Sequence, residues 1–70
     1  MPSYIELNDF LKINNVAATG GKVKIIIRSG IVKVNGEIET RNRKKLVPGD
    51  KVQIEERVFT VGPEVVREHS

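Results

Sequence analysis

The absence of cysteine from a chain of only 70 residues sets the tightest limit on its fold. A domain of this size buries a small apolar core and stands near the lower limit of independent stability. Without cysteine it has neither disulfides nor thiolate-bound zinc to reinforce that core. The single histidine, His69, is too little for a zinc site built from histidines. We therefore expect one small domain that depends on its hydrophobic core, without a metal or other cofactor.

The apolar segments are too short for a membrane protein. The first ten residues lack the basic start and apolar run of a signal peptide. The longest uninterrupted apolar run, Ile25-Ile26-Ile27, is far too short to span a bilayer. The sequence therefore predicts a cytoplasmic protein without membrane contact, which we further expect to be a monomer.

Charge is unevenly distributed along the chain. The segment from Lys12 to Lys51 holds ten basic and three acidic residues, whereas the two ends together hold two basic and six acidic ones. A basic middle between acidic ends is typical of a protein with one surface for a polyanion and another kept clear of it. Charged surfaces that bind no polyanion carry similar patterns, so charge alone leaves both interpretations open.

Cap and turn signals divide the chain into short elements. Asn8 is a good helix N-cap, and apolar residues at helical spacing predict a short helix over 9–15. The strands that we expect lie over 31–34, 51–55 and 58–61. Val47-Pro48-Gly49-Asp50 fits a type II turn, with proline second and glycine third.

The chain is expected to end in a tail. Gly62-Pro63 breaks the pattern of short strands, and the residues that follow are mostly polar. The sequence therefore predicts a compact domain over 3–61 and a polar C-terminal tail over 62–70, mobile from Glu64 onward.

The segment 21–29 fits either a helix or a strand. Four β-branched residues in five favour a strand. A helical wheel instead gathers three apolar side chains on one arc, namely Val23, Ile26 and Ile27. The wheel puts Lys24 and Arg28 together on a face away from that arc. Periodicity alone does not decide between the two.

Asn35-Gly36 is a strong turn signal between two strands. A loop of only these two residues would pair Val34 with Glu37, and this would mix apolar and charged side chains on one face. Including Glu37 in the loop pairs Val34 with Ile38 and sorts the two faces. We therefore expect a longer or bulged turn.

The order of these motifs is similar to that of a known family. The motifs are Thr19-Gly20-Gly21-x-Val23-Lys24, an apolar run before Gly30, Val32-x-Val34-Asn35-Gly36-Glu37, Arg41-x-Arg43-Lys44-Lys45-Leu46 and Pro48-Gly49-Asp50-x-Val52. Together they resemble the S4 domain, and above all the small stand-alone bacterial S4-like proteins. No single motif is specific, but their order and spacing over about 7–54 are. The resemblance implies an α+β fold (the alpha-L motif), with two short helices packed on a small, mostly antiparallel sheet. It thereby makes 21–29 a helix.

The resemblance also implies a function. S4 domains bind structured RNA, so the expected partners are ribosomal RNA, transfer RNA or a ribosomal particle. The expected role lies in ribosome assembly or translation quality control. Lys24 matches a basic position in the second helix of the family, and Arg28, one turn later, is also often basic there. Gly20-Gly21 departs from ribosomal S4, which has larger residues at these positions, and agrees with the stand-alone subgroup.

Eight basic residues are candidates for RNA contact, because proteins recognise double-stranded RNA mainly through its shape, phosphates and 2′-hydroxyls. They are Lys22, Lys24, Arg28, Lys33, Arg41, Arg43, Lys44 and Lys45. Those over 41–45 are expected to form a flexible clamp, in which arginine makes bidentate phosphate contacts. The two glycines before Lys22 would let a phosphate approach the backbone.

Simpler interpretations exist for several of these residues. Gly20-Gly21 fits a tight turn between helices, and Lys22 fits an ordinary solvated surface. Lys33 could serve only as the cross-strand partner of Glu39, a weak surface interaction. For the whole protein, the alternative is a protein–protein adaptor whose basic face is incidental. Catalysis is not expected, because the chain lacks a cysteine nucleophile and a phosphate-binding loop motif.

Overall fold

The computed structural model describes residues 3–68. Its elements in chain order are β1 (Ser3–Glu6), α1 (Leu7–Ile13), α2 (Gly20–Arg28), β2 (Val32–Val34), β3 (Glu37–Ile38), β4 (Lys45–Leu46), β5 (Lys51–Ile54), β6 (Arg57–Thr60) and β7 (Arg67–Glu68). None of the helices in this range is long and apolar enough to cross a lipid bilayer.

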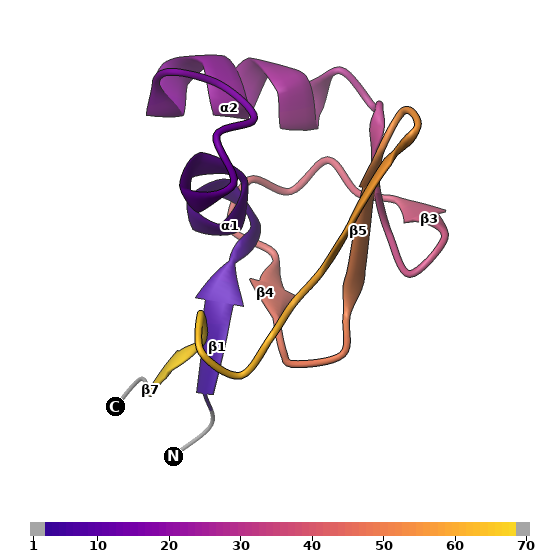
Figure 1. Ribbon diagram of the computed structural model, residues 1–70. Coiled ribbons are helices and arrows are strands. Elements are labelled where there is room, and N and C mark those ends of the chain that lie inside the picture. Colours follow the sequence, from indigo (N-terminus) through magenta and orange to yellow (C-terminus); the bar gives the residue numbers. More distant parts are fainter. Residues whose placement is uncertain (1–2, 69–70) are drawn as a thin grey trace.

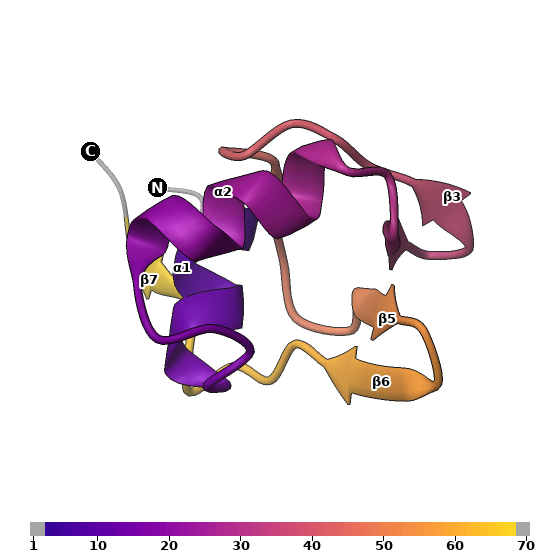
Figure 2. The ribbon, with the colours of Figure 1, turned by 90° about the horizontal axis from the view of Figure 1, so that it is seen from above.

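The strands form two small sheets rather than the single sheet expected. One has the order β4-β1-β7 and the other the order β3-β2-β5-β6, and the pairings between these strands are antiparallel. In Figure 1, α1 continues directly from β1, and α2 lies across α1 at the top of the molecule. Figure 2, seen from above, shows α2 covering α1 with β5 and β6 to one side. The α+β fold implied by the resemblance is confirmed.

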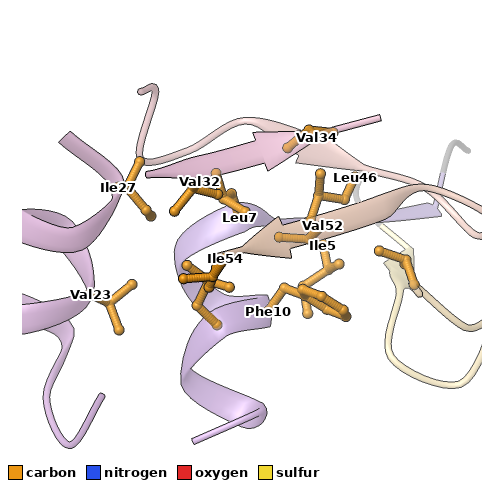
Figure 3. Packing of buried hydrophobic residues seen from close by; sticks show 12 residues of the cluster. Ile5, Leu7, Phe10, Val23, Ile27, Val32, Val34, Leu46, Val52 and Ile54 are labelled. Atoms are coloured by element: carbon orange, nitrogen blue, oxygen red, sulfur yellow. The ribbon is translucent and has the colours of Figure 1, made fainter. Parts of the chain in front are cut away.

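The ambiguous segment is helical, as the resemblance implies. The hydroxyl oxygen of Thr19 accepts a hydrogen bond from the Lys22 backbone N–H at 3.2 Å and caps α2. Gly30, at φ +86°, ends it. Val23 and Ile27 are fully buried, and in Figure 3 both point from α2 toward α1 and the β2–β5 pair. Burying each contributes about 1.5–3 kcal/mol, which outweighs a helix-propensity penalty of about 0.7 kcal/mol or less per residue.

The first helix begins two residues earlier than the sequence predicts, and Asn8 is not its N-cap. Glu6 occupies that position without a side-chain capping bond. The first turn is satisfied by a distant loop instead. The backbone N–H of Leu7 donates to the carbonyl oxygen of Lys44 at 2.8 Å, and that of Asn8 donates to Asn42 at 3.0 Å. Tertiary hydrogen bonds thus replace the local cap that the sequence suggests.

The predicted register of the β2–β3 hairpin is wrong. Val34 pairs with Glu37, so the loop is Asn35-Gly36 alone. Both loop residues have positive φ, 52° and 87°, as a type I′ turn requires. Glu37 and Ile38 are both exposed on a two-residue edge strand. No buried face therefore selects the register, and the turn decides it.

The turn after β4 agrees with the prediction. Gly49 has φ +97°, and the Asp50 backbone N–H donates to the Val47 carbonyl oxygen at 3.0 Å. The Asp50 carboxylate accepts from the Val47 backbone N–H and from the Asn35 side-chain amide. These bonds tie the tip of one hairpin to the turn that leads into β5.

The core gathers the apolar sides of both helices and both sheets. Its buried members are Ile5, Leu7, Phe10, Leu11, Val23, Ile27, Val32, Val34, Leu46, Val52, Ile54 and Val61. Val52 and Ile54, at alternate positions of β5, are among them. Phe59 is half-buried and lies edge-on to Phe10, with the ring centres 6.4 Å apart. This single core holds α2 in place and leaves its outer face exposed.

Part of the segment expected to be a polar tail lies against the domain. β7 pairs with β1 through Ser3–Glu68 and Tyr4–Arg67, and Val65 and Val66 pack against the core. The domain boundary at residue 62 and the mobility of this segment remain predictions. The last two residues of the predicted tail, 69–70, lie outside the described residues.

Candidate nucleic-acid interface

The outer face of α2 presents the first group of candidate residues. Lys22, Lys24 and Arg28 are all exposed, whereas Val23 and Ile27 of the same helix are buried. Lys24 and Arg28 are one turn apart, so their side chains project from one face. Arg28 also lies in the last turn, where a positive charge stabilises the helix dipole.

The two glycines at the start of α2 are not required by packing. Neither has positive φ, and a Cβ on Gly20 would meet nothing closer than 3.8 Å, the side chain of Lys12. A Cβ on Gly21 would lie 4.0 Å from the Thr19 hydroxyl oxygen. These are ordinary van der Waals distances, so the tight-turn interpretation does not account for the glycines.

The second group of candidates, Arg41, Arg43, Lys44 and Lys45, lines a depression of about 320 Å³. This segment, the 41–45 loop, passes below α2 in Figure 1 and beside it in Figure 2. Its backbone is anchored to α1 by the carbonyl oxygens of Asn42 and Lys44. We expected this loop to be a flexible clamp, and these two bonds instead attach part of its backbone to the start of α1.

Both arginines of the 41–45 loop are held by carboxylates. The Nε and Nη2 atoms of Arg41 donate to the two carboxylate oxygens of Glu39 at 2.9 and 3.1 Å, in a bidentate fork. The Nε atom of Arg43 donates to Glu6 at 3.0 Å. The carboxylate side chains are only 13% and 20% exposed, whereas the arginine side chains are more than 70% exposed. The loop therefore offers less available charge than its sequence indicates.

The Glu39–Arg41 pair also shifts the ionisation of both groups. The hydrogen bond from the Arg41 side chain holds the pKa of Glu39 below its ordinary value of 4.5, and the positive charge of Lys44 lowers it further. The same bond raises the pKa of Arg41. Each partner stabilises the charged form of the other.

The remaining candidates lie in different surroundings. Lys44 is half-buried, and the Nζ atom of Lys45 lies 4.9 Å from the centre of the Tyr4 ring. Lys33 is exposed on β2 between the buried Val32 and Val34. Because side chains alternate along a strand, Lys33 projects from the sheet face opposite the helices. The structure thus separates Lys33 from the α2 face, and Glu39, its expected partner, binds Arg41.

Sequence reasoning missed three features of this surface. The Glu39–Arg41 pair had a signal, since residues two apart in an extended segment share a side. The Glu6–Arg43 pair joins residues 37 positions apart and depends on the tertiary fold. Ile25, which the helical wheel leaves off the apolar arc, is exposed among the cations of α2.

Comparison with known proteins gives the family. The model of the S4 domain family matches residues 2–62. "Putative RNA-binding protein YbcJ" of Escherichia coli K12 is 45% identical over 49 residues, 70% of each chain. "Probable ribosome maturation protein RlbA" of Bacillus subtilis is 41% identical over 51 residues, 73% of this chain and 72% of that one. With the helices and the antiparallel sheets that the fold requires, these matches establish that the chain belongs to the S4 domain family.

Proposed function

We propose that this protein binds structured RNA through the outer face of α2, extended by the 41–45 loop, and that it has no catalytic role. The observation that carries the proposal is the group Lys22, Lys24 and Arg28. These three exposed cations share one rigid helix, and among residues 3–66 no carboxylate lies within ion-pair distance of them. Such an array suits the phosphates of an RNA helix, which proteins read by charge and shape.

The start of α2 supports the same proposal. Backbone N–H groups in the first turn of a helix favour a phosphate, and the helix dipole adds to the attraction. Glycine lowers helix stability, and packing does not require it at Gly20 or Gly21. A backbone without Cβ atoms beside Lys22 allows a phosphate oxygen to approach closely.

The RNA that we propose is ribosomal or transfer RNA, met during ribosome assembly in the cytoplasm by a monomeric protein. The name of the Bacillus subtilis relative refers to ribosome maturation, and that of the Escherichia coli relative to RNA binding. Sequencing the RNA crosslinked to this protein in cells tests the proposal. Enrichment of precursor ribosomal RNA is expected, and enrichment of messenger RNA alone would contradict it.

Charge reversal on α2 tests the proposed surface. Changing Lys24→Glu and Arg28→Glu together should weaken binding to an RNA hairpin about a hundredfold at low salt, because two attractive contacts become repulsive. The matched control is Lys51→Glu with Arg57→Glu, which changes net charge equally on the β5–β6 hairpin. The control should lose less than about tenfold.

Circular dichroism should match that of the wild type in both variants, since all four side chains are exposed. Equal losses in the two variants would reduce the effect to net charge and contradict the assigned surface. Unchanged affinity in both would favour a protein–protein adaptor with an incidental basic face.

A further inference from the structure

The basic face of α2 carries one large apolar side chain, Ile25. It is 70% exposed, more than any other exposed large hydrophobic side chain in the described part of the protein. Its neighbours three or four positions away on the helix are Gly21, Lys22, Arg28 and Ser29. Two of these four neighbours are cations, and Ile25 is not part of the core. One exposed apolar side chain is ordinary on a protein surface, so a role for Ile25 depends on the surface beside it.

A shallow depression adjoins Ile25. Its volume is about 350 Å³, within the range of about 300–1,000 Å³ typical of small-ligand sites. It is lined by Val16, Ala17, Ala18, Lys22, Ile25 and Ile26. The floor is aliphatic and made partly of small residues, and the one charged group that lines it is a lysine.

This combination selects the occupant. The cations at 22, 24 and 28 favour an anionic ligand. The aliphatic floor favours an uncharged, flat or apolar group that is attached to that anion. A nucleotide whose base has left the helical stack offers both, since its phosphate can meet Lys22 while its base enters the depression. A continuous RNA duplex offers only phosphates and sugars here, because its bases remain stacked.

We propose that the depression beside Ile25 takes the base of an unpaired nucleotide, so that the preferred ligand is an RNA helix interrupted by a bulge. This inference rests on the proposed RNA binding and narrows its ligand class. Aliphatic side chains can pack against either face of any base, so the site reads an unpaired position more than a particular base.

A second copy of this chain is a poor occupant of the same depression. Two α2 faces brought together would oppose Lys22, Lys24 and Arg28 with the same residues of the partner. Like charges brought face to face disfavour such an interface.

The test uses a blunt RNA duplex and the same duplex with one unpaired nucleotide, binding to the full chain. The wild type should bind the bulged RNA about tenfold more tightly, because the base buries apolar surface against the aliphatic side chains of the depression. Ile25→Ser should reduce that preference to less than about twofold, with an unchanged salt dependence, because no phosphate contact is lost. The control Ile38→Ser, at a 63% exposed isoleucine on β3, should keep the preference.

Each other outcome is informative. Equal binding of the two RNAs by the wild type would overturn the inference and leave the proposed function standing. Binding of neither RNA at low salt would overturn both. A preference that survives Ile25→Ser would place the base elsewhere. If sedimentation shows a dimer that Ile25→Ser abolishes, a second copy of the chain occupies the depression, and this result would overturn the inference.

Discussion

The α2 face and the 41–45 loop have similar numbers of basic residues, but they differ in how many of these are paired with carboxylates. The loop has four basic residues and the helix face three. Both loop arginines are bound to carboxylates, Glu39 and Glu6, which are half-buried. The three cations of α2 have no such partner in the described chain.

This difference changes what each region gains by binding a phosphate. A cation of α2 exchanges water for phosphate. Glu39 already occupies two of the five N–H donors of Arg41, and its carboxylate lies next to any phosphate that binds there. The exchange leaves a smaller net gain. The helix face should therefore dominate affinity, and the loop should adjust it.

Placing a carboxylate on α2 should pair one of its cations, as the loop arginines are paired, and weaken its binding to phosphate. Gly21→Glu sets a carboxylate three residues before Lys24, at a position where a Cβ fits without a close contact. RNA affinity should fall about thirtyfold through lost phosphate contact and repulsion. Stability should nevertheless rise by about 0.5–1.5 kcal/mol, because glycine leaves the helix and an acid enters its first turn.

The control for this change is Gly21→Gln, which has the same size and no charge. The difference between the two variants isolates the carboxylate in a filter-binding assay. Equal affinity for Glu and Gln would mean that Lys24 does not contact the RNA.

Releasing the loop arginines should have the opposite and smaller effect. Glu6→Gln with Glu39→Gln removes both partners, so Arg41 and Arg43 become available to phosphate. Affinity for a hairpin should rise about tenfold, and its salt dependence should become steeper. The same changes combined with Arg41→Gln and Arg43→Gln should abolish the gain. The four changes together restore the wild-type net charge, so a gain that persists would come from the loss of the two carboxylates and not from the arginines.

The smallest effect concerns acid stability. Because its pKa is held below 4.5 by Arg41, Glu39 contributes stability that is present above that value and lost as pH falls through the lowered pKa. Glu39→Gln should therefore flatten the loss of stability below about pH 4.5 and leave neutral stability nearly unchanged. Urea unfolding at several pH values measures this. An unchanged acid limb would mean that the pair contributes nothing to folding.

The sequence predicted most of the fold, but little of the difference between the unpaired cations of α2 and the paired arginines of the 41–45 loop. Val23 and Ile27 favour a strand by propensity, and only the resemblance to the family decided for a helix at α2. The prediction of the β2–β3 register was wrong because it assumed that Ile38 lies on the buried face of the sheet. Ile38 is exposed on an edge strand. Turn chemistry at Asn35-Gly36 was the stronger constraint.

Some features of the candidate site could also be predicted from the sequence, and others could not. The exposed positions of Lys24 and Arg28 follow from helical geometry and could be foreseen. The partner of Arg43 could not, because β1 reaches the loop only through the tertiary fold. The depression beside Ile25 likewise needs the α1–α2 connection folded against α2.

The most direct test of the central claim is the salt dependence of RNA hairpin binding for two neutralised variants. Lys24→Gln with Arg28→Gln should flatten the slope of log K against log salt by about 1.4–1.8, since each phosphate contact contributes about 0.7–0.9. Arg41→Gln with Arg43→Gln should flatten it by less than about 1, because part of that charge is already matched by Glu39 and Glu6. An equal or larger change from the loop pair would contradict the account.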